Sequence, residues 1–109
     1  MEKLKGSLKK HLRGIAHGQK PVVFVGQKHL TANVIKAIHE SLEYHELIKV
    51  KCIDFKEKEQ KKEIAAEIEK LAGCELVGMI GHMLTFYRQH PDPEKRKIIL
   101  PPIEADFLL

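Results

Sequence analysis

The chain has 109 residues, 43% of them hydrophobic, with 19 lysines and arginines, 15 acids and a formal net charge of +4. A chain of this length forms one domain around one core, which excludes a multidomain enzyme. Two cysteines cannot build the disulfide framework of a small secreted module, and no apolar run approaches the ~20 residues of a membrane helix. We therefore expect a single cytoplasmic domain over residues 1–109, with about 102–109 as a flexible tail.

The positive charge is concentrated in the first quarter of the chain. Residues 1–28 contain seven lysines and arginines against one acid, Glu2. A smaller excess lies in residues 82–97, where four bases face two acids. Such an uneven distribution favours a polyanionic partner.

Apolar residues recur at helical spacing between Leu4 and Ile15, which predicts a helix that ends near Gly18. Lys5, Lys9 and Arg13 follow one another at intervals of four residues and so share one line of that helix. This line is either a solvated face or a binding ridge. The near absence of acids favours the ridge.

A short apolar run at 22–25, between a proline and a glycine, predicts a strand buried on both faces. Thr31 is then a candidate N-cap for a helix that ends near residue 45. Residues 47–53 predict a second strand, so this region forms a βαβ unit within one sheet. Lys49 and Lys51 share one face of the second strand, and the sequence leaves open whether helices cover it.

The remainder predicts a third helix over about 57–72 and then a hairpin. Its two strands are the apolar runs 76–80 and 83–88, joined by Gly81-His82. Residues 98–100 are a candidate short edge strand. The predicted order is α–β–α–β–α–β–β, a two-layer α/β (α+β) domain.

The turn after the first strand combines a glycine, a lysine and a helix N-terminus. Gly26 has no Cβ, so a nucleic-acid backbone can approach closely, and free N–H groups beside Lys28 favour a phosphate. Turns with one glycine are also common where nothing binds, so this signal is weak by itself.

Six stretches of the chain together carry a more specific signal. They are HLRGIAH (11–17), KPVVFVG (20–26), LT (30–31), EYHELIKVK (43–51), IGHMLTFYR (80–88) and RKIILP (96–101). In this order they resemble the CRM domain (chloroplast RNA splicing and ribosome maturation), and in particular its stand-alone bacterial YhbY-like form. The resemblance covers roughly residues 3–101.

The resemblance implies an RNA-binding domain whose four-stranded mixed sheet is backed by helices on one face, similar to the C-terminal domain of translation initiation factor three. It also implies a role in assembly of the large ribosomal subunit, and an RNA contact at a KH-like GxxG loop. By position this loop is Gly26, Gln27, Lys28 and His29. His29 departs from the pattern because the family has glycine there. If the position requires positive φ, histidine is less favourable than glycine, although it is enriched in that region.

The candidate RNA-binding residues form three groups: the loop, the basic segment before it and the basic segment after the last strand. They are Gly26, Gln27, Lys28 and His29; Lys9, Lys10, Arg13 and Lys20; and Arg88, Lys95, Arg96 and Lys97. For the last group the alternative is an exposed proline-rich loop without a binding role.

No catalytic or metal-binding pattern stands out. The histidines show no HExxH spacing, the spacing of Cys74, His82 and His90 fits no structural zinc site, and Cys52 alternates onto the apolar side of its strand. We expect a non-catalytic monomer that binds ribosomal RNA in large-subunit precursors, without cofactor, metal, small-molecule substrate or membrane. The alternative is an adaptor that binds a ribosomal protein or an assembly GTPase; only the RNA contact should weaken steeply with salt.

Overall fold

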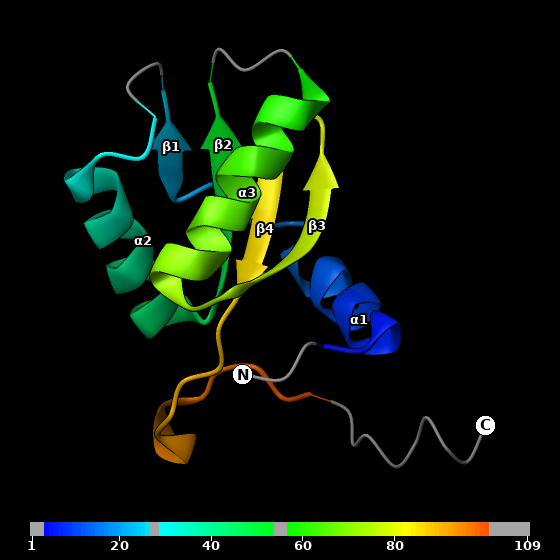
Figure 1. Ribbon diagram of the computed structural model, residues 1–109. Helices are drawn as coiled ribbons and strands as arrows, with labels where there is room; N and C mark the ends of the chain where they lie inside the picture. The colour runs from blue at the N-terminus through cyan, green and yellow to red at the C-terminus, as the bar shows by residue number, and fades with distance from the viewer. Residues whose placement is uncertain (1–3, 27–28, 54–56, 101–109) are drawn as a thin grey trace.

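The computed structural model describes residues 4–26, 29–53 and 57–100. Three helices pack on a four-stranded sheet (Figure 1). The elements are α1 (Gly6–Ala16), β1 (Val23–Val25), α2 (Ala32–His45), β2 (Leu47–Cys52), α3 (Lys58–Ala72), β3 (Glu75–Ile80), β4 (Met83–Tyr87) and the 3-10 turn η1 (Pro93–Lys95). This succession confirms the predicted α+β order.

The sheet is mixed, with strand order β1-β2-β4-β3. β1 and β2 run parallel on either side of the α2 connection, whereas β4 pairs antiparallel with both β2 and β3. The predicted βαβ unit and hairpin are therefore confirmed. Within the described chain, no helix has the length and apolar character needed to cross a bilayer.

The two faces of the sheet are covered differently. α2 and α3 pack over one face, where residues such as Ile38, Val50 and Phe86 form the main core. α1 lies against the other face, where Leu12 and its neighbours pack on a smaller cluster. The expectation of helices on one face is thus correct for α2 and α3 and wrong for α1.

β1 also differs from its prediction as a strand buried on both sides. Val23 and Val25 are buried against the main core, but the side chain of Phe24 between them is 52% exposed. β1 is an edge strand at the end of the sheet away from β3, and α1 contacts β2, β3 and β4 instead. The face of β1 opposite α2 is therefore left open.

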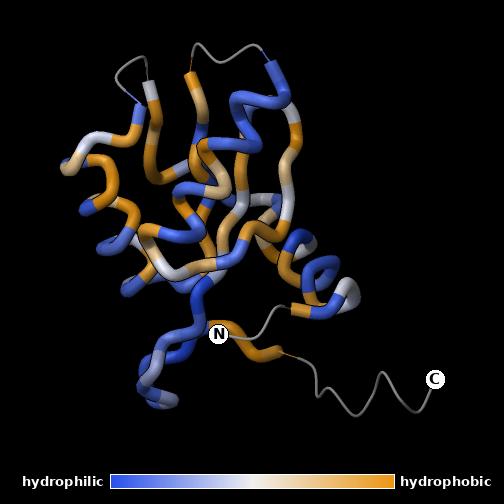
Figure 2. Tube along the Cα trace, viewed as in Figure 1, coloured by the Kyte–Doolittle hydropathy of each residue, from blue (hydrophilic) through white to orange (hydrophobic). Residues whose placement is uncertain are grey.

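Local signals place the ends of two helices as expected. The Thr31 hydroxyl accepts a hydrogen bond from the Val34 N–H at 3.2 Å, which is an N-cap for α2. Gly73 ends α3 with φ +61°. The predicted edge strand at 98–100 does not form; Ile98 and Leu100 pack instead against the α1 cluster. In Figure 2 these hydrophobic residues follow a hydrophilic stretch that leaves β4.

One buried carboxylate holds this C-terminal segment to the sheet. Glu46, fully buried between α2 and β2 at φ +64°, accepts hydrogen bonds from the backbone N–H groups of His90, Lys97 and Ile98 at 2.6–3.0 Å. Its own carbonyl oxygen accepts from the Arg88 N–H. Three donors compensate the burial of the charge, so Glu46 acts as the anchor of residues 88–98.

Candidate nucleic-acid interface

The glycine turn lies at the top of the sheet in Figure 1, between β1 and the start of α2. The His29 N–H donates to the Gly26 carbonyl at 2.9 Å, and His29 adopts φ +60°. The fourth loop position therefore does take the left-handed conformation, with histidine in place of glycine. A Cβ on Gly26 would meet no atom within 4 Å, so packing within the protein does not require glycine there. Gln27 and Lys28 lie outside the described residues.

The bases of α1 do not form one uniform ridge. Lys9 pairs with the buried Glu75 carboxylate at 3.3 Å, and the same carboxylate accepts from the Leu4 N–H. The positive charge of Lys9 is therefore neutralised by Glu75 at the start of β3. Lys10 is exposed, and so is Lys20 in the linker between α1 and β1.

Arg13 crosses from α1 onto β3. Its Nη1 donates to the Val77 carbonyl at 2.9 Å, and its aliphatic stem lies over Gly78. A Cβ at position 78 would stand only 2.9 Å from Arg13 Cδ, so glycine is what allows this approach. No carboxylate neutralises the guanidinium among its described contacts, so Arg13 presents a fixed positive charge.

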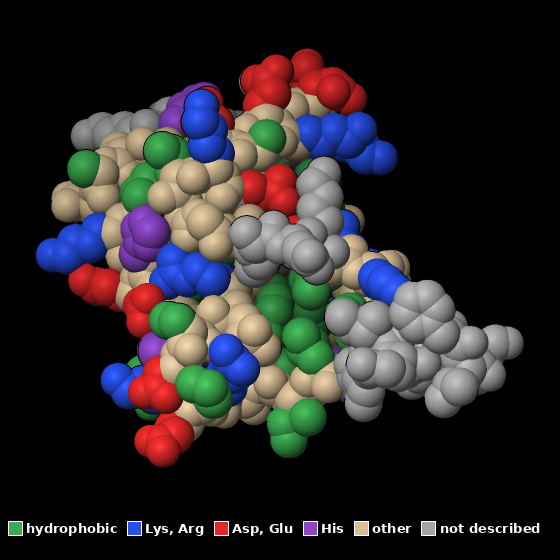
Figure 3. All heavy atoms as spheres, turned by 60° about the horizontal axis from the view of Figure 1, so that its bottom comes forward, with side chains coloured by type: hydrophobic (Ala, Val, Ile, Leu, Met, Phe, Trp, Pro, Cys, Tyr) green, Lys and Arg blue, Asp and Glu red, His purple; other side chains and the backbone are tan. Residues whose placement is uncertain are grey.

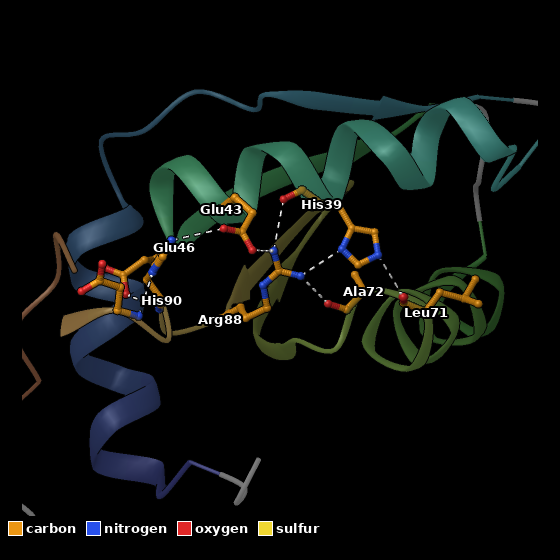
Figure 4. Close-up of polar contacts among 8 residues, drawn as sticks. His39, Glu43, Glu46, Leu71, Ala72, Arg88 and His90 are labelled. Atoms are coloured by element: carbon orange, nitrogen blue, oxygen red, sulfur yellow. Dashed lines mark hydrogen bonds and ion pairs between the residues drawn. The ribbon is translucent and has the colours of Figure 1, made fainter. Parts of the chain in front are cut away.

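Arg88, by contrast, is an internal residue rather than part of a second basic patch. Its side chain is 17% exposed, and its guanidinium donates to the carbonyls of Ala72 and His39 and contacts the carboxylate of Glu43 (Figure 4). Its Nη1 also lies 3.0 Å from His39 Nδ1. Because Ala72 is the last residue of α3, the cation sits at a helix C-terminus and ties α3 to α2. We therefore remove Arg88 from the candidate interface.

Lys95, Arg96 and Lys97 lie at the end of the molecule opposite the glycine turn. Arg96 Nε donates to the His90 carbonyl at 2.8 Å, and Lys97 Nζ stands 3.6 Å from the centroid of the Tyr44 ring. Figure 3 shows this underside, where the visible lysine and arginine side chains are separated by acidic, histidine and hydrophobic ones. These three bases therefore do not join the turn or α1 in one surface.

A region that the sequence analysis left undecided connects α1 with the turn. The strand register aligns Phe24, Lys51, Met83 and Ile80 in one row across all four strands, and Lys49, Thr85 and Gly78 in the next row. We call these seven residues the open half-face, because α1 packs around Tyr87 and leaves the ends of the first row exposed; within the second row Thr85 is buried and the Arg13 stem lies over Gly78. Phe24 and Ile80 are 52% and 78% exposed.

All charged residues of the open half-face are basic. Lys49 and Lys51 are its only charged members, and Lys49 Nζ lies 3.4 Å from the carbonyl oxygen of His17 at the end of α1. Arg13 borders it over Gly78. None of its seven residues is acidic. The row that contains Lys51 and Phe24 ends two residues before Gly26, so basic side chains lie between α1 and the turn.

Sequence reasoning missed Phe24 because a run of four apolar residues is typical of a strand buried on both faces. The available signal was the short length of the run, since very short strands are typical of a sheet edge.

The two thiols are interior groups. Burial raises the pKa of Cys52, and burial together with the nearby Glu69 raises that of Cys74 to about 12.

The fold and this surface define a class: a small α+β domain with a strand–glycine turn–helix unit beside an open basic sheet face. The profile of the CRS1 / YhbY (CRM) domain matches residues 4–88. The chain belongs to this family.

Known proteins support the assignment over nearly the whole chain. An RNA-binding protein of Haemophilus influenzae is 39% identical over 93% of this chain and 98% of its own length. The Probable RNA-binding protein YqeI of Bacillus subtilis is 37% identical over 90% of this chain and 99% of its own length. The solution structure of SAV1595 from Staphylococcus aureus, a hypothetical protein proposed to bind RNA, superposes with a TM-score of 0.78 at 35% identity, covering 91% of this chain and 100% of that one.

Proposed function

We propose that this protein is a non-catalytic RNA-binding protein that acts as a cytoplasmic monomer on ribosomal RNA in precursors of the large ribosomal subunit. The observation that carries the proposal is the group of basic side chains that extends from Arg13 on α1 across the open half-face toward the glycine turn, with no acidic residue among the seven members of that half-face. The names of the relatives as RNA-binding proteins support the same class of ligand. Assistance to subunit assembly follows from the family resemblance.

RNA phosphates have two binding regions on this surface. In this proposal an RNA phosphate binds at the N-terminus of α2, beside the glycine turn, where it gains from the helix dipole and from the close approach that Gly26 permits. Lys10, Arg13 and Lys20 extend the positive potential along α1 and its linker. Binding of this kind depends on counterion release, so affinity falls steeply as salt rises.

Charge reversal tests the proposal. We expect Lys10→Glu with Lys20→Glu to weaken binding to a transcribed fragment of large-subunit ribosomal RNA by about tenfold or more in a filter-binding assay at moderate salt. In a sucrose gradient, the same variant should no longer co-sediment with large-subunit precursors. The matched control reverses Lys62 and Lys70, which are exposed on α3 across the sheet.

The outcomes also separate the adaptor alternative. If the α1 reversal and the α3 reversal bind RNA equally well, the surface is wrong. If neither of the two charge-reversal variants binds RNA but both still co-sediment with precursors at high salt, an apolar contact with a ribosomal protein or an assembly GTPase replaces the RNA proposal.

A further inference from the structure

The open half-face combines exposed apolar side chains with lysines, as surfaces that bind single-stranded nucleic acid do. Within the first row, Lys51 stands between Phe24 on β1 and Met83 on β4. Because neighbouring strands lie about 4.8 Å apart, Phe24 and Met83 are separated by roughly 10 Å with a lysine between them. An exposed aromatic ring beside a cation serves a stacked base and its phosphate at the same time.

A groove lies next to this row, where α1 meets the sheet. It has a volume of about 250 Å³ and is lined by Arg13, Ala16, His17, Lys49, Gly78, Ile80, Met83 and Thr85. That volume is below the ~300 Å³ at which pockets begin to enclose a whole small molecule. It therefore suits part of a longer ligand, such as one planar base with its backbone outside.

The charges distinguish RNA from a protein partner. Arg13, Lys49 and Lys51 surround the apolar side chains, and no described residue of the open half-face or the groove is acidic. Lysine is depleted at protein–protein interfaces, whereas lysine beside exposed aromatic residues is typical of single-strand binding sheets. Apolar side chains such as Phe24 and Ile80 gain nothing from an A-form duplex, whose bases are stacked and paired.

We propose that the open half-face binds unpaired nucleotides, with one base stacked on Phe24, a neighbouring base against Met83 in the groove, and the phosphates along Lys51, Lys49 and Arg13. This inference rests on the proposed function, because it specifies unpaired RNA as the ligand of that surface. It assigns the base contact to Phe24, which lies two residues before Gly26.

The test compares Phe24→Ala, Phe24→Leu and Phe24→Tyr by fluorescence anisotropy with a labelled ten-nucleotide oligouridine and with a blunt RNA duplex. We expect Phe24→Ala to weaken oligouridine binding roughly 5- to 100-fold, as loss of one stacked base does. Phe24→Leu should lose most of the same affinity, and Phe24→Tyr should stay within about twofold of the parent protein. Duplex binding should be unchanged in all three variants.

A charge series tests the phosphate part of the proposal. Lys49→Gln with Lys51→Gln should make the dependence of log affinity on log salt shallower by about 1.4, whereas Phe24→Ala should leave this slope unchanged. Tyr44→Ala removes an aromatic side chain that is 65% exposed on α2, and this control should bind as the parent does. Circular dichroism and thermal unfolding verify that each variant is folded.

The results distinguish the two proposals. If Phe24→Ala and Phe24→Leu bind oligouridine as well as the parent protein while the Lys10 and Lys20 reversal weakens binding, the stacking site is wrong and the RNA-binding function stands. If Phe24→Ala weakens oligouridine and duplex equally, the residue contributes shape rather than stacking, which also overturns the inference. If the parent protein binds neither RNA, the proposed function itself fails.

Discussion

The two ends of the sheet use their basic residues in opposite ways. At the end near the glycine turn, Lys49, Lys51 and Arg13 have no carboxylate among their described contacts. At the other end Arg88 is held by two helices, and the buried Glu46 holds the segment that carries Lys95–Lys97. Basic charge in a sequence therefore indicates a binding surface only where the fold leaves it unpaired.

Removal of the Glu46 anchor should have the largest effect on stability. Glu46→Ala leaves three backbone N–H groups without their acceptor, so we expect the free energy of unfolding to fall by about 3 kcal/mol in urea titrations. Glu43→Gln, at a carboxylate that is 58% exposed, is the control and should cost less than 1 kcal/mol. Equal losses in the two variants would contradict the role of Glu46.

Arg88 provides the sharpest contrast between the two ends. Arg88→Gln removes the contacts to Ala72, His39 and Glu43, so the protein should lose about 2 kcal/mol of stability. RNA affinity, measured below the unfolding transition, should stay within about twofold. A variant with parent-like stability and lost RNA binding would return Arg88 to the interface.

Gly78→Ala should affect both stability and binding. The added Cβ would stand 2.9 Å from Arg13 Cδ, so the arginine stem must move away from β3. We expect a cost of about 1 kcal/mol in thermal unfolding, together with weaker RNA binding. Gly14→Ala on α1, where a Cβ meets nothing within 4 Å, is the matched control and should not weaken binding.

The smallest effect at neutral pH concerns Tyr87. Burial, with a further contribution from Glu46, raises the pKa of its hydroxyl from 10.0 to about 12. The folded state therefore keeps a proton that the unfolded chain loses, so stability is retained below pH 10 and falls between about pH 10 and 12, by at most about 1.4 kcal/mol per pH unit.

Tyr87→Phe tests this directly. The hydroxyl has no hydrogen-bond partner among the described residues, so the variant should be as stable as the parent or slightly more stable at pH 7. Above pH 10 its unfolding free energy should fall less steeply than that of the parent. Part of the slope remains, because the raised pKa of Cys74 acts in the same direction. Identical alkaline profiles would show that Tyr87 does not titrate as argued.

Much of the fold was predictable because its signals are local. The spacing of apolar residues in α1, the Thr31 cap and the Gly81-His82 turn each act within a few residues, and each element formed where it was predicted. The candidate site was predictable only in part. The sequence pointed to the turn and to the basic residues of α1, which stay predictions. Lys9 and Arg88, however, contact Glu75 and His39, which lie 66 and 49 residues away along the chain.

By itself, the sequence determined the order of helices and strands, the family and the uneven distribution of positive charge. The tertiary structure decided which of those charges remain free and which sheet face stays open. The physical reason is that ion pairs such as Lys9–Glu75 and the row from Phe24 to Ile80 join residues far apart along the chain. Such pairings have no local periodicity: strand pairing forms the row, and the packing of α1 on the sheet forms the ion pair.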